Sequence, residues 1–282
     1  MKLKNFDFTQ KVYLHPEHVV KLKNNGRPFP MTIEVDLTNH CNHRCSFCCW
    51  GEDIAVDKST LDTKIIKKCI HDMKKLGAKA ICFTGGGEPM IHKDFYQILS
   101  FTKKNELDCG LITNGSAIIK EHYLELLNNL QWIRISVSGG DAASYNKVQG
   151  KDHFERVINN IEMLAKEKVK ENNNIKIGIR MLVNEINLYT LSKLAERIKN
   201  FNGINYLQIS PNQFSDDEGK FWNGPDVDNE IKKTEKILKT GNIELLTSSF
   251  EILSTSKEEQ QKLINYPKRC YAHFYQITIM AD

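Results

Sequence analysis

The sequence lacks any long apolar run. No stretch of its 282 residues approaches the roughly 20 apolar residues that a membrane-spanning helix needs, and its opening residues, MKLKNFDFTQ, hold no apolar core of signal-peptide length. A strong charge imbalance is also missing, because 39 Lys and Arg stand against 35 Asp and Glu and leave a net charge of only +4. We therefore expect a cytoplasmic protein with neither a membrane nor a nucleic acid as its partner.

Cysteine, by contrast, is present eight times and is unevenly placed. Four of the eight lie in TNHCNHRCSFCCWG, residues 38–51, and in a reducing compartment such a cluster indicates a metal or redox site rather than disulfides. Cys69, Cys82 and Cys109 lie in apolar segments, where we expect them to pack as small hydrophobic residues.

Strand and helix signals alternate along most of the chain. Six strands, each separated from the next by a helix, predict an α/β fold of parallel βαβ units. The expected strands are residues 32–37, 80–84, 109–113, 132–137, 175–183 and 206–210, and the expected helices are 62–76, 95–104, 121–130, 154–166, 188–199, 227–239 and 257–264. In the first helix we expect Ile65, Cys69, Met73 and Leu76 to form one stripe. In the helix at 154–166 we expect the inward-facing residues to be Phe154, Val157, Ile158, Ile161 and Leu164. We expect residues 139–152 to form a long loop that, together with Tyr145, covers the mouth of the fold.

Polar clusters follow the C-terminal ends of successive predicted strands, the edge at which parallel α/β folds collect ligands and catalytic groups. They are the cysteine loop (residues 38–51), the glycine-rich turn from Gly85 to Pro89, Thr113-Asn114-Gly115, and Ser136-Val137-Ser138. We expect these clusters to form one site.

The cysteine spacing favours a metal centre with an open position. Cys41, Cys45 and Cys48 follow C-x3-C-x2-C spacing, and three thiolates would leave one iron of a [4Fe–4S] cluster free for another ligand. The neighbouring Cys49 is expected to point elsewhere. If it does not, a closed four-thiolate zinc loop is the alternative.

Together, these motifs resemble those of the radical S-adenosylmethionine (SAM) superfamily. The resemblance rests on the three cysteines with Phe47 before the third, on Gly86-Gly87-Glu88-Pro89 matching the GGEP motif, and on Thr113-Asn114-Gly115 matching TNG, all in order over residues 30–210. It implies a partial (β/α)6 TIM-like barrel with a short C-terminal extension, which agrees with the six strands counted above. The cofactors it implies are a [4Fe–4S] cluster and SAM, which the reduced cluster cleaves to a 5′-deoxyadenosyl radical.

The resemblance also assigns roles to individual residues. Cys41, Cys45 and Cys48 hold the cluster, and the SAM-binding candidates are Phe47, Gly86, Gly87, Glu88, Asn114, Ser136, Arg180 and Asn184. Glu88 would meet the amino group of SAM and Ser136 its ribose. Arg180 is a candidate for the carboxylate of SAM, and a barrel-lining ion pair is the alternative. Asn184 is a candidate for the ribose, and a polar residue at a helix start is the alternative.

Two positions depart from the family pattern. Ser136-Val137-Ser138-Gly139 stands where many relatives carry Ser-x-Asp-Gly. Gln149 precedes Gly150, where many relatives carry Arg-Gly with the arginine on the carboxylate of SAM. This second departure leaves the carboxylate partner open.

The C-terminal residues resemble the start of a SPASM or twitch extension. Cys270 precedes an aromatic-rich strand over residues 275–280, and the sequence ends at Asp282. One cysteine cannot hold a cluster, so we expect no auxiliary cluster from these residues. The predicted division is an N-terminal segment at 1–29, a radical SAM barrel at 30–211 and the extension at 212–282.

The predicted function is that of a radical SAM enzyme of oxidoreductase or transferase type. Its substrate is expected to be a small natural product, a sugar or a peptide side chain, and its electron donor a protein such as flavodoxin or ferredoxin. The rival hypothesis is a non-catalytic or zinc-binding barrel protein, a truncated relative without radical chemistry.

Overall fold

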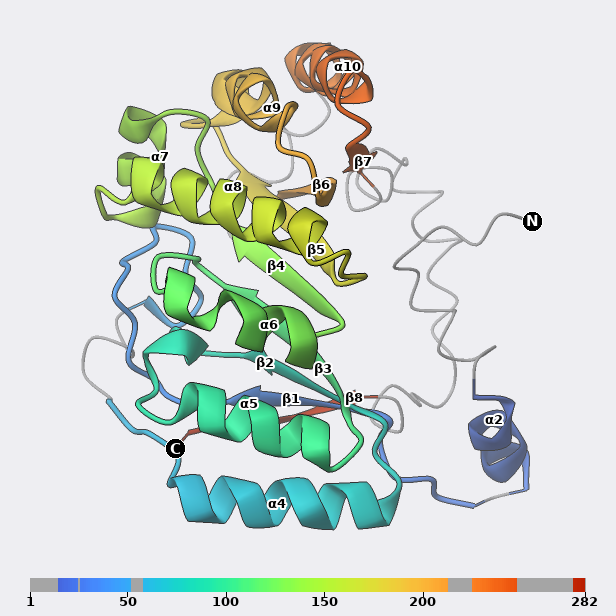
Figure 1. Cartoon of the computed structure of the whole chain (residues 1–282). Helices are drawn as coiled ribbons and strands as arrows, with labels where there is room; N and C mark the ends of the chain where they lie inside the picture. The colour runs from blue at the N-terminus through green and yellow to red at the C-terminus, as the bar shows by residue number, and fades with distance from the viewer. Residues whose placement is uncertain (1–14, 25, 52–57, 213–224, 248–275, 282) are drawn as a thin grey trace.

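Eight parallel strands form one sheet with helices along one of its faces (Figure 1). The computed structural model describes residues 15–24, 26–51, 58–212, 225–247 and 276–281. The strands are β1 (Thr32–Asp36), β2 (Ala80–Thr84), β3 (Asp108–Thr113), β4 (Trp132–Ser136), β5 (Lys176–Val183), β6 (Ile204–Pro211), β7 (Glu244–Leu246) and β8 (Gln276–Ile279). The helices are α2 (Pro16–Lys23), α4 (Thr63–Leu76), α5 (Phe95–Lys104), α6 (Tyr123–Asn129), α7 (Ala142–Gln149), α8 (Phe154–Lys170), α9 (Leu191–Ile198) and α10 (Pro225–Lys239).

The strand order is β7-β6-β5-β4-β3-β2-β1-β8, and every neighbouring pair is parallel. Among the described residues the two edge strands do not pair with each other, so the sheet is an open, partial barrel. The predicted α/β class and the six successive parallel strands are confirmed. Consecutive strands lie beside each other, which brings all their C-terminal ends to one edge.

Two strands outside the predicted six extend the sheet at its edges. β7 pairs with β6, and it went unpredicted because three residues are too few to display a period of two. β8 falls inside the strand predicted at residues 275–280 and pairs with β1 along Thr32–Val35. The chain beyond residue 211 therefore supplies two strands to the same sheet.

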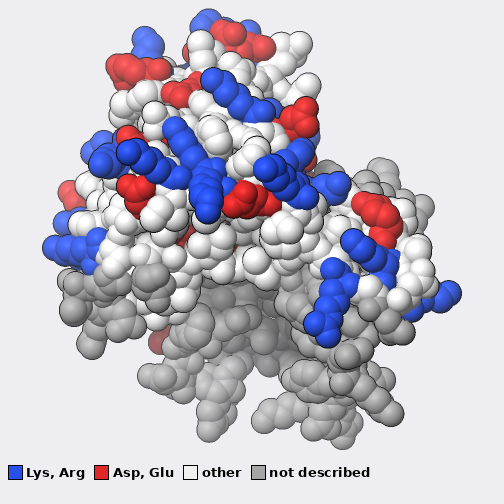
Figure 2. Space-filling model, turned by 90° about the horizontal axis from the view of Figure 1, so that it is seen from below, with Lys and Arg blue, Asp and Glu red and all other residues white. Residues whose placement is uncertain are grey.

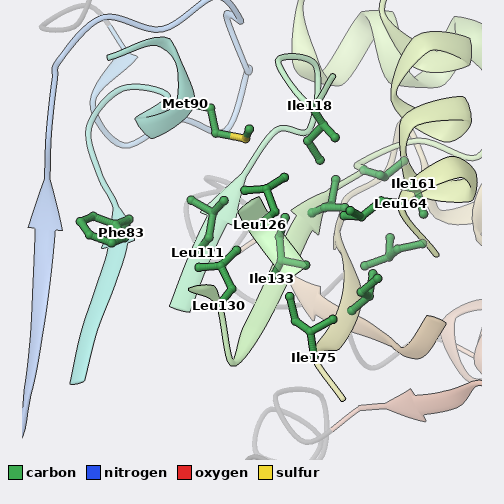
Figure 3. Close-up of a cluster of buried hydrophobic side chains, with 14 of the residues drawn as sticks. Phe83, Met90, Leu111, Ile118, Leu126, Leu130, Ile133, Ile161, Leu164 and Ile175 are labelled. Atoms are coloured by element: carbon green, nitrogen blue, oxygen red, sulfur yellow. The ribbon is translucent and has the colours of Figure 1, made fainter. Parts of the chain in front are cut away.

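The hydrophobic core lies between the sheet and the helices (Figure 3). Alternate strand residues, such as Leu111 on β3 and Ile133 on β4, point toward this layer and are fully buried. They meet Leu126 of α6 and Ile161 of α8. The inward stripe predicted for α8 is confirmed, since Phe154, Val157, Ile158, Ile161 and Leu164 are all buried.

Helix α4 buries a different stripe from the one predicted. Its buried residues are Ile66, Ile70 and Met73, whereas Ile65 and Leu76 are each 60% exposed. Apolar residues occur on both candidate stripes, so helical periodicity alone could not choose between them. The packing of α4 against the sheet determines which of the two stripes is buried.

The expected loop at residues 139–152 contains helix α7, so that prediction was wrong. Asp141 caps the helix by accepting a hydrogen bond from Ser144 N, and the Ser144 hydroxyl accepts one from Asp141 N in return. Gly150 ends the helix in the left-handed conformation, at φ +66°. Tyr145 is fully buried rather than poised over an opening. Eight residues show too little periodicity to distinguish a short helix from a loop.

The surface carries charges of both signs. Figure 2 shows Lys and Arg interspersed with Asp and Glu over the described residues of the lower face. None of the described helices has the length and apolar character needed to cross a membrane. The helix predicted at 257–264 and the candidate Cys270 lie outside the described residues.

Candidate active site

The cysteine loop leaves the C-terminal end of β1 and folds into tight turns. Cys48 N donates to Cys45 O at 3.1 Å, and Gly51 N donates to Cys48 O at 3.1 Å. Cys41, Cys45 and Cys48 are partly buried free thiols, whereas Cys49 is exposed. The three predicted ligands thus share a more sheltered environment than the fourth cysteine.

Burial favours the protonated form of two of these thiols. Burial, followed by repulsion from the charges of the neighbouring Cys41 and Cys48, raises the pKa of Cys45 to about 12. Burial also raises the pKa of Cys41. A cation relieves this repulsion and displaces the protons, so the loop is suited to binding metal as thiolates.

Among the described residues, no three Cys, His, Asp or Glu side chains converge on one point as ligands of a single metal ion would. The thiols are nevertheless close enough for their charges to interact. In a [4Fe–4S] cluster held by three cysteines, each cysteine would bind a different iron. The three thiols can therefore lie further apart than the ligands of a single metal ion and still hold a cluster.

The glycine-rich turn after β2 is attached directly to the cysteine loop. Gly87 N donates to Thr38 O at 3.0 Å, and Glu88 N donates to His40 O at 2.7 Å. A Cβ on Gly87 would overlap the carbonyl oxygens of His40 and Thr38. Glycine is required here because the two backbones touch.

Glu88 is buried where the ends of β2 and β3 meet. Its Oε1 accepts hydrogen bonds from Thr113 Oγ1 at 2.6 Å and Met90 N at 3.1 Å, and its Oε2 accepts one from Asn114 N at 2.7 Å. Burial nevertheless raises the pKa of Glu88. A carboxylate offers about four acceptor positions, so one remains for a further donor such as an ammonium group.

The predicted candidate Asn114 links its own loop to the cysteine loop. Its Nδ2 donates to Asn42 Oδ1 at 2.8 Å, and its Oδ1 accepts from Ser116 Oγ at 2.7 Å. Asn42 Nδ2 completes the ring by donating to Ser116 Oγ at 2.8 Å. Sequence reasoning missed Asn42 and Ser116, although a polar residue directly after Cys41 was an available signal.

Helix α7 holds the other side of the cysteine loop. Arg44 N donates to Gln149 O at 3.2 Å, and Ser46 N donates to Val148 O at 2.8 Å. The Gln149 side chain accepts from Ser138 N at 2.6 Å, while its Nε2 is buried and has no hydrogen-bond partner. A buried, unpaired N–H at this position is a donor for an acceptor that the described part of the chain does not provide.

The remaining candidates lie in different surroundings. Phe47 is half-buried in the cysteine loop, and Ser136, at the end of β4, stands in register with Arg180 on β5. The Oδ1 of Asn184 accepts from Ile186 N and Asn187 N in the turn before the short helix Leu188–Thr190, whose N-cap is Asn187 rather than Asn184. The Gly86 Cα faces Asn39 and Trp50 of the cysteine loop.

These residues fit the two cofactors that the motifs imply. Three sheltered thiols form a donor set for a [4Fe–4S] cluster. Glu88 retains an acceptor position for an ammonium group, and Gln149 Nε2 is an unpaired donor for a carboxylate oxygen. An α-amino acid group, such as the one SAM carries, offers both partners.

Comparison with known proteins gives a consistent result. The sequence profile of the Radical SAM superfamily matches residues 35–180. A probable GTP 3′,8-cyclase of Thermococcus kodakarensis is 28% identical over 56% of this chain and 49% of its own length. The AdoMet-dependent heme synthase of Nitratidesulfovibrio vulgaris is 28% identical over 65% of this chain and 50% of its own. The chain thus spans about half the length of these curated relatives.

Among solved structures, SuiB of Streptococcus suis bound to precursor peptide SuiA superposes with a TM-score of 0.67. The match covers all of this chain and 64% of SuiB at 16% identity, so it supports the fold alone. Another crystal structure of SuiB contains S-adenosylmethionine.

Proposed function

Since this chain belongs to the radical SAM superfamily, we propose that it is an enzyme that cleaves SAM reductively and abstracts hydrogen from an organic substrate. Members of the family use a [4Fe–4S] cluster and SAM. The bound cluster supplies the electron for the cleavage, and this chain's residues hold, orient and shelter the reactants.

One observation carries the proposal: the cysteine loop and the glycine-rich turn are joined backbone to backbone. The hydrogen bonds from Gly87 N to Thr38 O and from Glu88 N to His40 O fix the two motifs beside each other. A cofactor ligated by the cysteines is then held next to the Glu88 carboxylate. Preorganisation of this kind lowers the entropic cost of bringing the reacting groups together.

We assign cluster ligation to Cys41, Cys45 and Cys48, and Cys49 is left out because it is exposed. Glu88 would accept a hydrogen bond from the amino group of SAM. Gly86 and Gly87 allow the glycine-rich turn to lie against the cysteine loop. Phe47, Asn114 and Ser136 remain proposed SAM-binding residues, and Asn184 is the weakest of the set because its side chain is engaged locally. Gln149 Nε2 takes the place of Arg180 as the proposed donor to the carboxylate of SAM.

The substrate is a small natural product, a sugar or a peptide side chain. The names of the curated relatives refer to small molecules, and SuiB is bound to a peptide, so both classes stay within the proposal. Cluster chemistry of this kind requires an electron donor, such as flavodoxin or ferredoxin, and is suited to a reducing, cytoplasmic environment. We further propose residues 30–211 as the radical SAM unit and 212–282 as the start of a SPASM or twitch region.

The test compares two adjacent cysteines. After anaerobic reconstitution, the wild-type protein should contain about four irons and four sulfides per chain, the composition of one cluster. With dithionite and SAM it should form 5′-deoxyadenosine. Cys48→Ala should abolish the product and most of the bound iron, while the matched variant Cys49→Ala should retain both.

The rival hypothesis makes the opposite prediction. A wild-type protein that binds one zinc ion and forms no 5′-deoxyadenosine would be a metal-binding barrel without radical chemistry. Equal loss of metal in Cys48→Ala and Cys49→Ala would indicate a closed four-thiolate site.

A further inference from the structure

The face of the sheet that turns away from the helices carries two arginines on adjacent strands. Arg134 lies on β4 and Arg180 on β5. Ser136 is two residues from Arg134 on the same strand, so their side chains share a face of the sheet, and Ser136 stands in register with Arg180. All three side chains therefore lie on one face. Gln208 on β6 stands in register with Arg180 and faces the same way. This group belongs to the inner face of the partial barrel.

The hydrogen-bonding capacity of this group is incompletely used. Arg134 Nη1 donates to Gln208 Oε1 at 3.2 Å, reaching across β5. The Nε atoms of Arg134 and Arg180 are both buried without a hydrogen-bond partner, and so is the hydroxyl of Ser210, two residues after Gln208. Three unpaired polar atoms thus lie on three neighbouring strands, where buried polar groups normally have partners.

Within the part of the chain that the structure describes, no carboxylate compensates the charge of Arg180. Burial, and then the nearby positive charge of Arg134, lower the pKa of Arg180 to about 10. Tyr206 has the opposite influence, and no Asp or Glu of the described chain contributes. Two partly buried guanidinium groups that have no carboxylate partner among the described residues are a costly arrangement, and an anion with two or more oxygens relieves it.

Two aromatic rings lie on the same face beside the arginines. Gly110 and Gly178 make room for them, because a Cβ on either glycine would overlap the ring of Trp132 or Tyr206. Gly178 stands in register with Arg134, so the Tyr206 ring lies next to that residue. Apolar surroundings lower the effective dielectric constant and strengthen the attraction between a guanidinium and an anion.

The position relative to the cysteine loop indicates which molecule supplies the anion. Arg180 is level with Ser136, the last residue of β4, and Arg134 lies two residues further into the sheet. A group held by both arginines therefore lies inward of the edge at which the cysteine loop and Glu88 meet. The substrate, rather than the cofactor, is the molecule expected there.

We propose that Arg134 and Arg180, assisted by Gln208 and Ser210, bind a carboxylate or phosphate group of the substrate. This inference rests on the proposed function, because it concerns the substrate of the same site. It narrows the substrate to an anionic molecule anchored on the inner face of β4–β6. The second possible source of the oxyanion is the carboxylate of SAM.

The experiment titrates simple oxyanions into the reconstituted protein. Inorganic phosphate and acetate are the probes, measured by calorimetry with and without saturating SAM. We expect at least one probe to bind with an affinity that SAM changes by less than twofold. Arg134→Gln and Arg180→Gln should each weaken that binding at least tenfold, whereas Arg156→Gln, an exposed arginine on α8, should not.

Circular dichroism checks that each variant is folded. If a glutamine variant is not folded, Arg134→Lys or Arg180→Lys is measured in its place. These lysine variants keep the charge but lose the planar fork, so they should weaken binding several-fold. Absence of binding by both probes, or binding that survives both glutamine variants, would overturn the proposal. Competition between SAM and the probe would assign the arginines to the cofactor instead.

The two proposals fail separately. A wild-type protein that forms no 5′-deoxyadenosine contradicts the radical function while leaving the anion titration unaffected. If the protein forms 5′-deoxyadenosine but binds neither probe, the proposed radical function stands and the proposed anionic substrate is contradicted.

Discussion

The Oε2 of Glu88 accepts a 2.7 Å hydrogen bond from the backbone N–H of Asn114, which joins the ends of β2 and β3 through a single buried carboxylate. The other oxygen of Glu88 accepts from Thr113 and Met90. Glu88 is therefore both a structural brace between two motifs and the proposed partner of the amino group of SAM. Changes at this residue should affect stability and cofactor affinity together.

Glu88→Gln should destabilise the fold and weaken SAM binding. The amide provides one acceptor oxygen for three donors, so a donor is left facing the amide NH2 group, at a cost of about 1–3 kcal/mol. Urea unfolding of the apo-protein measures the first effect, and calorimetry with the reconstituted protein measures the second. Glu121→Gln, at an exposed position, is the control. Unchanged unfolding in Glu88→Gln would contradict the bracing role.

Gly87→Ala should separate the cysteine loop from the glycine-rich turn. The new methyl group would overlap two backbone carbonyl oxygens, which cannot move aside as a flexible side chain can. We expect at least tenfold weaker SAM binding and a lower iron content after reconstitution. Gly51→Ala is the matched control, since a Cβ there meets nothing within 4 Å. Normal iron content and SAM affinity in Gly87→Ala would show that the backbone contact is dispensable.

Asn42→Ala should loosen the cysteine loop without touching a thiol. It leaves Asn114 Nδ2 and the Ser116 hydroxyl each short of a partner, which costs about 1–3 kcal/mol for each group that stays buried. The measurements are urea unfolding of the apo-protein and the rate at which a chelator bleaches the iron–sulfur absorbance. Bleaching should be faster than in the wild type and than in Asn146→Ala, an exposed control on α7. Identical rates would mean that this network does not support the loop.

Asp141 should make stability depend on pH in the acid range. The hydrogen bond from Lys193, followed by that from Ser144 N, lowers the pKa of Asp141 to about 2, below its usual value of about 3.9. Between these two values the unfolded chain binds the extra proton. The contribution of Asp141 is therefore complete above about pH 4 and is lost as the pH falls through 2.

Asp141→Asn isolates this effect, because asparagine caps a helix well but does not titrate. Urea midpoints at pH 5, 4 and 3 should fall more steeply for the wild type than for Asp141→Asn. Asp141→Ala, which also loses the cap, should cost about 0.5–2 kcal/mol at pH 5. Parallel pH profiles for wild type and Asp141→Asn would exclude the proposed titration.

Much of the fold was predictable because its signals are local. The strands β1 to β6 and the core face of α8 follow from periods of 2 and 3.6 residues in consecutive sequence. The active-site edge was predictable for the same reason: polar motifs follow strand ends, and parallel strands place those ends together. Two predictions were wrong: the buried stripe of α4, where the periodicity is ambiguous, and the loop at residues 139–152, where helix α7 is too short to show a clear periodicity.

The sequence by itself determined the order of the βα units, the three-cysteine spacing and the meeting of the motifs at one edge, because chain connectivity and residue alternation dictate them. Only the tertiary structure decided that Gln149 holds the cysteine loop, that β8 lies beside β1, and that Arg134 and Arg180 face inward together. Those relationships join residues far apart along the chain. They depend on register between strands and on backbone contact, and neither leaves a repeating pattern in the sequence.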